Sequence, residues 1–109
     1  MTWELSFLPE AQDDLRSLDG SQRIRVVKAI AKVRENPLPA SEGGYGKPLG
    51  NKRISQLSGL MKVKLKSDGI RIVYKLERAE HAMRIVVIGV RSADVVYREA
   101  QKRRESRGL

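Results

Sequence analysis

The chain has 109 residues, with 22 lysines and arginines against 13 aspartates and glutamates, and no cysteine. This length fits one domain over residues 1–109, and the lack of cysteine excludes disulfides, thiolate nucleophiles and cysteine metal sites. A single histidine cannot form a histidine metal cluster or a nuclease site with two histidines. The charge balance is +2 over residues 1–60 and +7 over residues 61–109. This asymmetry fits a polyanionic partner of the second half, but it fits a merely soluble basic surface as well.

No apolar run approaches the ~20 residues that a membrane-spanning helix needs, and the N-terminus lacks the charged-then-apolar pattern of a secretion signal. We therefore expect a cytoplasmic protein without membrane attachment. The residue types offer no metal site of a known pattern, so we expect any chemistry to proceed without a metal or another cofactor.

The N-terminal half predicts one strand and two helices. Residues 3–8 alternate as in a strand, and Pro9 suits the first position of a helix. After an Asp-Gly break, Ser21 can cap a second helix, which ends before Pro37. The prolines and glycines of residues 37–52 predict a loop. The apolar side of the second helix is expected to comprise Ile24, Val27, Ile30 and Ala31, widened by Val26 and Val33.

The C-terminal half predicts strands followed by a helix. Residues 61–66 and 70–76 alternate between apolar and mainly basic side chains, and Asp68-Gly69 between them favours a two-residue hairpin turn. Residues 84–90 are almost entirely apolar, as in a central strand. Ser92 can cap a last helix with a densely basic end.

These elements predict an α+β fold. The expected architecture is a small, mostly antiparallel sheet of four or five strands, including a weak candidate strand at residues 53–57. Two N-terminal helices are expected to pack on one face of this sheet, and a C-terminal helix follows the last strand.

The predicted hairpin gathers basic side chains on one surface. With the turn at Asp68-Gly69, Ser67 pairs with Ile70, and the core face holds Leu65 with Ile72, Val63 with Tyr74 and Met61 with Leu76. The opposite face pairs Lys66 with Arg71, Lys64 with Val73 and Lys62 with Lys75. Like charges across a sheet reduce its stability, so such a cluster is better tolerated where an anion binds. On this pattern alone, a solvated lysine face remains the simpler explanation.

Two stretches resemble the RelE toxins of the RelE/ParE toxin superfamily. They are LMKVKLKSDGIRIVY from Leu60 to Tyr74 and VIGVRSADVVY from Val87 to Tyr97. The likeness extends more loosely over nearly the whole chain. It implies the toxin of a type II toxin-antitoxin system, a ribosome-dependent endoribonuclease that cleaves messenger RNA in the ribosomal A site.

The resemblance also implies roles for five residues. Lys62 and Lys64 match paired lysines near the scissile phosphate, and Arg71 matches an arginine that stabilises the charged transition state. Arg91 matches an arginine at the end of the last strand, and Tyr97 a tyrosine that stacks on and orients a base. These five residues are the predicted catalytic set.

The chemistry fits these residue types. Attack by an RNA 2′-OH on the adjacent phosphate needs a base, an acid and cations around the charged phosphorane. Because neighbouring lysines repel each other's charge, Lys62 or Lys64 could serve as the base. Whether Arg91 acts as the acid is left open, since arginine stays protonated. Further basic side chains are expected to bind RNA phosphates, namely Lys66, Lys75, Lys102, Arg103 and Arg104.

The expected partners are a cognate antitoxin, the 70S ribosome and messenger RNA, with DNA contacted only through the antitoxin complex. Two other functions remain open at this stage. One is a DNA gyrase inhibitor of the ParE type, a branch that generally lacks the combination of Lys62, Lys64, Arg91 and Tyr97. The other is a module that binds RNA or the ribosome without catalysis, including an inactive relative retained as an antitoxin partner.

Overall fold

The computed structural model describes residues 3–49, 59–90 and 92–109. Its elements form one five-stranded sheet in the order β1-β5-β4-β3-β2, in which β1 runs parallel to β5 and the other pairs are antiparallel. The predicted α+β class with a mostly antiparallel sheet is therefore confirmed. In chain order the elements are β1 (Glu4–Phe7), α1 (Pro9–Ser17), α2 (Gly20–Arg34), β2 (Lys47–Pro48), β3 (Leu60–Leu65), β4 (Ile70–Glu77), β5 (Ala82–Gly89) and α3 (Ala93–Arg107).

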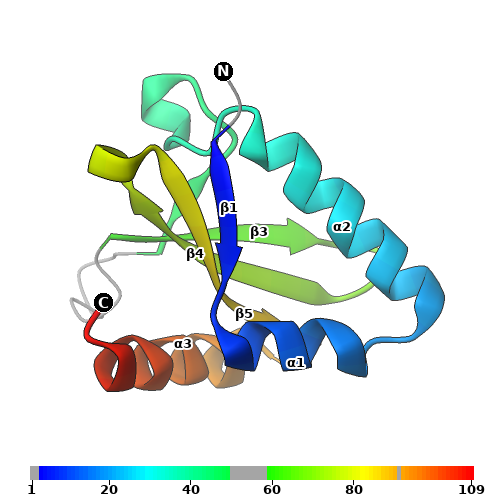
Figure 1. Ribbon diagram of the computed structural model, residues 1–109. Helices are drawn as coiled ribbons and strands as arrows, with labels where there is room; N and C mark the ends of the chain where they lie inside the picture. Colours follow the sequence, from blue (N-terminus) through cyan, green and yellow to red (C-terminus); the bar gives the residue numbers. More distant parts are fainter. Residues whose placement is uncertain (1–2, 50–58, 91) are drawn as a thin grey trace.

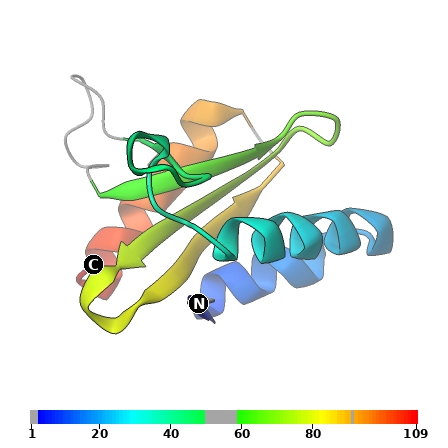
Figure 2. The same ribbon diagram turned by 90° about the horizontal axis from the view of Figure 1, so that it is seen from above.

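The helices cover both faces of the sheet. Helices α1 and α2 lie on one face, and α3 crosses the other (Figures 1 and 2). The sequence correctly predicted the two N-terminal helices on one face. The candidate strand at residues 53–57 lies outside the described residues. No helix among the described residues is long and apolar enough to span a bilayer.

Helix α2 begins two residues earlier than expected. Asp19, not Ser21, is the N-cap: its carboxylate accepts a hydrogen bond from the backbone N–H of Gln22 at 2.8 Å, and the Gln22 side chain accepts one from the Asp19 N–H. This reciprocal pair satisfies two backbone donors that a helix start leaves unpaired. The hydrogen bonds also lower the pKa of the Asp19 carboxyl below its ordinary value.

The inward face of α2 is rotated from the predicted one. Val26, Ile30 and Val33 are buried, whereas Ile24 and Val27 are 58% and 49% exposed. Both sets have helical spacing, so each describes a possible apolar stripe. The residues at positions i, i+4 and i+7 pack on the sheet, and the prediction that Ile24, Val27 and Ala31 face the core was wrong.

Tyr74 anchors the connection after α2 to the same face of the sheet. Its side chain is fully buried, and its hydroxyl donates a hydrogen bond to the carbonyl of Pro37 at 2.7 Å. Burial raises the pKa of this phenol. A Cβ at Gly46 would collide with the Tyr74 hydroxyl, so the chain passes close above the tyrosine. The prediction that Tyr74 lies on the core face of the hairpin is confirmed.

The β3–β4 hairpin differs from the prediction in register. Leu65 pairs with Ile70, so the loop contains four residues and not two. A two-residue turn of the type that Asp-Gly favours needs positive φ at both positions. Here Gly69 has φ of +66°, but Asp68 is not among the positive-φ residues and instead accepts a bidentate hydrogen bond from Arg25 of α2. The register moves by two residues, which leaves every side chain on its predicted face.

Candidate functional site

The face of the sheet opposite α1 and α2 carries a row of basic side chains. Lys62 and Lys64 alternate along β3, and Arg71 of β4 lies directly across from Lys64. Arg71 is in turn paired with Gly89 of β5, where a Cβ would come within 2.7 Å of Val96 in α3. The row therefore lies on the α3 side of the sheet, beside that helix. Because like charges repel across strands, this arrangement favours an anionic ligand.

The basic side chains of this row differ in their exposure to solvent. Lys64 is exposed, whereas Lys62 and Arg71 are partly buried. The prediction paired Lys64 with Val73 and Lys62 with Lys75, and the structure corrects both pairs: Val73 lies across from Lys62, and Lys75 across from Leu60. The two-residue shift therefore moves Lys64 next to Arg71, which brings two predicted catalytic cations into one cross-strand pair.

Tyr97 of α3 joins this row from above the sheet. The Nζ atom of Lys62 lies 5.9 Å from the centroid of the Tyr97 ring, within the range of a cation–π contact. The ring is only partly buried and packs against the edge of the core. Strand β3, strand β4 and helix α3 thus bring Lys62, Lys64, Arg71 and Tyr97 to one surface.

Arg91, the fifth predicted catalytic residue, lies outside the described residues. It belongs to the connection between β5, which ends at Gly89, and α3, which begins at Ala93. Its proposed role consequently rests on the sequence resemblance alone.

Lys47 is a further cation of this surface that the sequence did not predict. It lies in β2, directly across from Lys62, so the two side chains share a face at the edge of the sheet. The surrounding prolines and glycines predicted only a loop, and a strand of two residues carries no alternating pattern. The term "basic face" is used below for Lys47, Lys62, Lys64 and Arg71.

The side chains predicted to bind RNA fall into two groups. Lys66 in the hairpin loop and Lys102 on α3 are exposed. The other three have partners within the domain. The Nζ atom of Lys75 donates to the Leu109 carbonyl at 3.5 Å, and the Nε atom of Arg104 donates to the same carbonyl at 3.1 Å. Arg103 forms ion pairs with Asp14 and Glu99. RNA contacts by these residues stay predictions.

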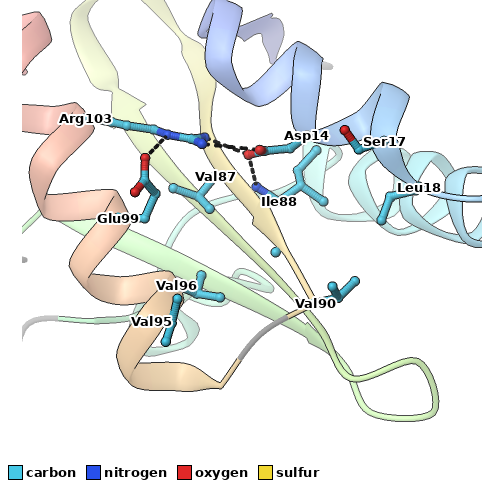
Figure 3. Close-up of a pocket in the computed structure, with 11 residues that line it drawn as sticks. Asp14, Ser17, Leu18, Val87, Ile88, Val90, Val95, Val96, Glu99 and Arg103 are labelled. Carbon is cyan, nitrogen blue, oxygen red and sulfur yellow. Dashed lines mark hydrogen bonds and ion pairs between the residues drawn. The ribbon is translucent and has the colours of Figure 1, made fainter.

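A groove of about 540 Å³ lies elsewhere, between α1, the end of β5 and the start of α3 (Figure 3). Its lining includes Asp14, Val90, Val95 and Arg103, and none of the four described catalytic candidates. His81 is engaged in a different contact: its ring stacks on the ring of Trp3, with 4.0 Å between the two centroids. Among the described residues, no group of three histidine or carboxylate side chains is placed to hold a metal ion.

The basic face can bind a phosphodiester and supply both cations and an aromatic ring to it. Lysine and arginine neutralise phosphate charge, and a partly exposed tyrosine offers a surface on which a base can stack. These groups lie on two adjacent strands and a helix of one domain, so their relative positions are defined by the fold.

Comparisons with known proteins agree with this geometry. No family model matches the chain. The mRNA interferase toxin RelE of Escherichia coli is 28% identical over 103 residues, which are 94% of this chain and 98% of that protein. A solved mutant of E. coli RelE in the free state has a TM-score of 0.72 at 26% identity, with 94% of this chain and 98% of that one covered.

A second solved structure, an E. coli RelE mutant in complex with a peptide of the antitoxin RelB, has a TM-score of 0.66 at 25% identity. It covers 92% of this chain and 95% of that one. The likeness in sequence and the likeness in fold thus extend over nearly the full length on both sides. In both respects, the chain is similar to the RelE toxins of E. coli.

Proposed function

We propose that this chain is the toxin of a type II toxin-antitoxin system and acts as a ribosome-dependent endoribonuclease that cleaves messenger RNA in the A site. The observation that carries the proposal is the meeting of Lys62, Lys64, Arg71 and Tyr97 on one surface of a RelE-like fold. The relatives described above are named RelE mRNA interferases, which favours RNA over DNA gyrase as the target.

The proposed reaction is an internal transesterification. The 2′-oxygen of the nucleotide before the cut forms a bond to the adjacent phosphorus while the bond to the 5′-oxygen breaks. The proton of the 2′-OH passes to a base, and the leaving 5′-oxygen receives a proton from an acid. The products are a 2′,3′-cyclic phosphate, which can open to a 3′-phosphate, and a 5′-hydroxyl end.

The lysines and arginines divide this work. Lys62 or Lys64, as the neutral amine, accepts the 2′-OH proton. Arg71 lies across from Lys64 and stabilises the extra negative charge of the phosphorane with fixed N–H donors. We assign a second charge-stabilising role to Arg91 from the sequence resemblance.

Tyr97 orients the RNA by stacking on a base. Its ring lies near Lys62, so a nucleotide stacked on it would lie close to the proposed base. The position of α3 therefore determines how well the 2′-OH is aligned. The exposed Lys66 and Lys102 add phosphate attraction around this centre.

The ribosome supplies the remaining alignment. Free RNA can approach the basic face in many orientations. Fixing the messenger in the A site converts a rare reactive geometry into a frequent one, a gain that can exceed the contribution of any single side chain. An activity on ribosomes also implies a cytoplasmic location.

The proposed inhibitor is an antitoxin that covers the basic face. The net charge of +9, concentrated in the second half of the chain, fits a partner with an acidic binding segment. In the E. coli structure above, RelE is bound to a RelB peptide. We propose that a corresponding antitoxin binds this chain and provides the DNA contacts of the complex.

The proposal is tested with purified ribosomes programmed with a defined messenger, beside the same RNA without ribosomes. Wild type is compared with Arg71→Ala and with Arg16→Ala, which removes an arginine of α1 that is 70% exposed. We expect cuts inside the A-site codon with wild type and Arg16→Ala only, and only on ribosomes. Equal cutting by Arg71→Ala, or no cutting by folded wild type, would overturn the proposal.

A further inference from the structure

Helix α3 has a small apolar contact with the sheet. Its buried residues are Val96 and Ala100, which form one short ridge along the helix. Val96 rests against Gly89, where the absence of a side chain lets the helix approach closely. Because only two small side chains of the helix are fully buried, contacts of the residues that flank this ridge contribute to its rotation.

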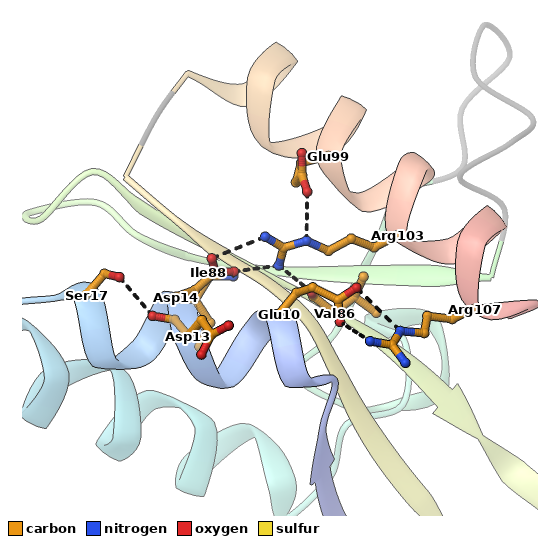
Figure 4. Close-up of polar contacts among 9 residues, drawn as sticks. All are labelled: Glu10, Asp13, Asp14, Ser17, Val86, Ile88, Glu99, Arg103 and Arg107. Carbon is orange, nitrogen blue, oxygen red and sulfur yellow. Dashed lines mark hydrogen bonds and ion pairs between the residues drawn. The ribbon is translucent and has the colours of Figure 1, made fainter.

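Arg103 supplies such contacts on one flank of the ridge (Figure 4). Its Nη1 atom donates to the Asp14 carboxylate at 2.6 Å and to the Val86 carbonyl at 2.9 Å. Its Nη2 atom donates to the other Asp14 oxygen at 3.2 Å, and its Nε atom to Glu99 at 2.8 Å. The Arg103 side chain is only 12% exposed, which distinguishes this ion pair from an ordinary surface pair.

Asp14 and Arg103 also pair with backbone groups of β5 beyond the end of its partner strand β1. The β1 strand pairs with β5 only as far as Phe7 with Ile85. Beyond that point, Asp14 accepts a hydrogen bond from the N–H of Ile88 at 3.0 Å, and Arg103 donates to the carbonyl of Val86. Asp14 of α1 and Arg103 of α3 thus satisfy the unpaired backbone groups of β5 and join both helices to it.

Tyr97 projects from the other flank of the ridge. At about 100° per residue, Tyr97 and Arg103 lie on opposite sides of the line through Val96 and Ala100. They are separated by about 9 Å along the helix axis. A roll of α3 that releases Arg103 would therefore move the Tyr97 ring across the basic face and change its distance from Lys62.

From this geometry we propose that Asp14 is a positioning residue: through Arg103 it sets the rotation of α3 and so holds Tyr97 beside Lys62. The inference rests on the proposed function for its effect on cleavage, but not for its effect on the position of Tyr97. A second pair, Arg107 with Glu10 at 2.7 Å, joins the same helices. Its side chains are 41% and 34% exposed, so it constrains the helix less.

The test compares Asp14→Asn with Asp13→Asn. The first keeps an oxygen for the Ile88 N–H but removes the charge that Arg103 needs. The second removes a carboxylate from the neighbouring position, where its ion pair with Arg16 is fully solvated, with side chains 72% and 70% exposed. If Asp14→Asn does not fold, Arg103→Lys weakens the pair from the other side while it retains the charge.

Two readouts separate positioning from stability. The chain has three tyrosines, so the full-length protein labelled with 3-fluorotyrosine gives three ¹⁹F resonances, and Tyr97→Phe identifies that of Tyr97. Tyr74, buried on the opposite face, and Tyr45 serve as internal references. The second readout is the single-turnover cleavage rate on programmed ribosomes, measured against ribosome concentration.

We expect Asp14→Asn to shift the Tyr97 resonance alone and to slow cleavage by about 10- to 100-fold, with no change in the half-saturating ribosome concentration. Asp13→Asn should match wild type. An unmoved Tyr97 resonance, a shift without loss of rate, or a joint shift of all three tyrosines would each overturn the inference. If wild type itself does not cleave, the proposed function fails and the Tyr97 resonance alone decides the role of Asp14.

Discussion

The face of the sheet under α1 and α2 and the face under α3 are built in different ways. On the first, side chains such as Ile72 and Tyr74 are completely buried, and three residues of α2 pack into the same core. On the second, α3 buries two residues, and the strands present lysines and an arginine beside it. One face concentrates apolar contacts that stabilise the fold, and the other carries charged side chains, of which Lys64 is exposed and Lys62 and Arg71 are partly buried.

This difference suggests how one small domain combines stability with a strongly basic surface. Repulsion within the basic face works against folding. The opposite face can offset this cost because its apolar contacts are independent of the charged residues. Substitutions on the two faces should therefore separate into those that change the free energy of unfolding and those that change cleavage.

The largest effect on stability is expected on the α1–α2 face. Ile72→Ala removes three carbons from a fully buried site and should lower the free energy of unfolding by about 2–5 kcal/mol. Urea denaturation followed by circular dichroism measures this loss. A loss below about 0.5 kcal/mol, the size typical of surface substitutions, would contradict the account of this face as the stabilising one.

A smaller loss is expected where α3 approaches the sheet. The Cβ atom of Gly89→Ala would lie 2.7 Å from a methyl carbon of Val96, so the helix has to move away. Overpacking of this kind costs about 1–3 kcal/mol. We compare Gly89→Ala with Ile72→Val, which loosens the opposite face, under conditions in which the two variants are folded to the same fraction. Gly89→Ala should then cleave more slowly than Ile72→Val. Equal cleavage by the two variants would contradict the link between the position of α3 and activity.

The salt dependence of RNA binding tests whether Lys47 takes part in the function of the basic face. If it contacts a phosphate beside Lys62, Lys47→Ala should reduce by about 0.7 the slope of log binding constant against log salt concentration for single-stranded RNA. Lys28→Ala is the matched control, because Lys28 is exposed on α2 over the opposite face. Fluorescence anisotropy of a labelled RNA measures both slopes, and equal slopes for the two variants would show that Lys47 contacts no RNA phosphate.

The smallest expected effect concerns the ionic attachment of α3. The hydrogen bond from Arg107 lowers the pKa of Glu10 below its ordinary value of 4.5. A carboxyl whose folded pKa is depressed stabilises the fold above its unfolded pKa, and this contribution is lost as the pH falls through the folded pKa. The Tm of wild type should therefore exceed that of Glu10→Gln at neutral pH, and the gap should close well below pH 4.5. A gap independent of pH would contradict this.

The sequence predicted the faces of the hairpin better than its register. Alternation with a period of two assigns Lys62, Lys64 and Arg71 to one side whatever even shift the strands adopt. The register itself depends on the loop, where Asp68 is held by Arg25 from a helix 43 residues earlier in the chain. Local turn preferences contain no information about that contact. For the same reason, the spacing in α2 could not show which of two apolar stripes faces the sheet.

The candidate site could be predicted from the sequence where its residues are close along the chain, and not where they are distant. Lys62 and Lys64 follow from one strand, and Tyr97 from the resemblance of its segment. Lys47 lies in a segment that composition assigns to a loop. The ion pair of Arg103 with Asp14 joins residues 89 positions apart, so the basic tail appeared to be uniformly available to RNA.

Cleavage by two double variants of equal charge tests the central claim most directly. Lys62→Ala with Lys64→Ala removes two lysines from the basic face, and Lys28→Ala with Lys32→Ala removes two exposed lysines from α2. The account predicts that single-turnover cleavage on programmed ribosomes falls by more than ~100-fold in the first variant and is retained in the second. Equal rates for the two variants would contradict the assignment of the α3 side as the active surface.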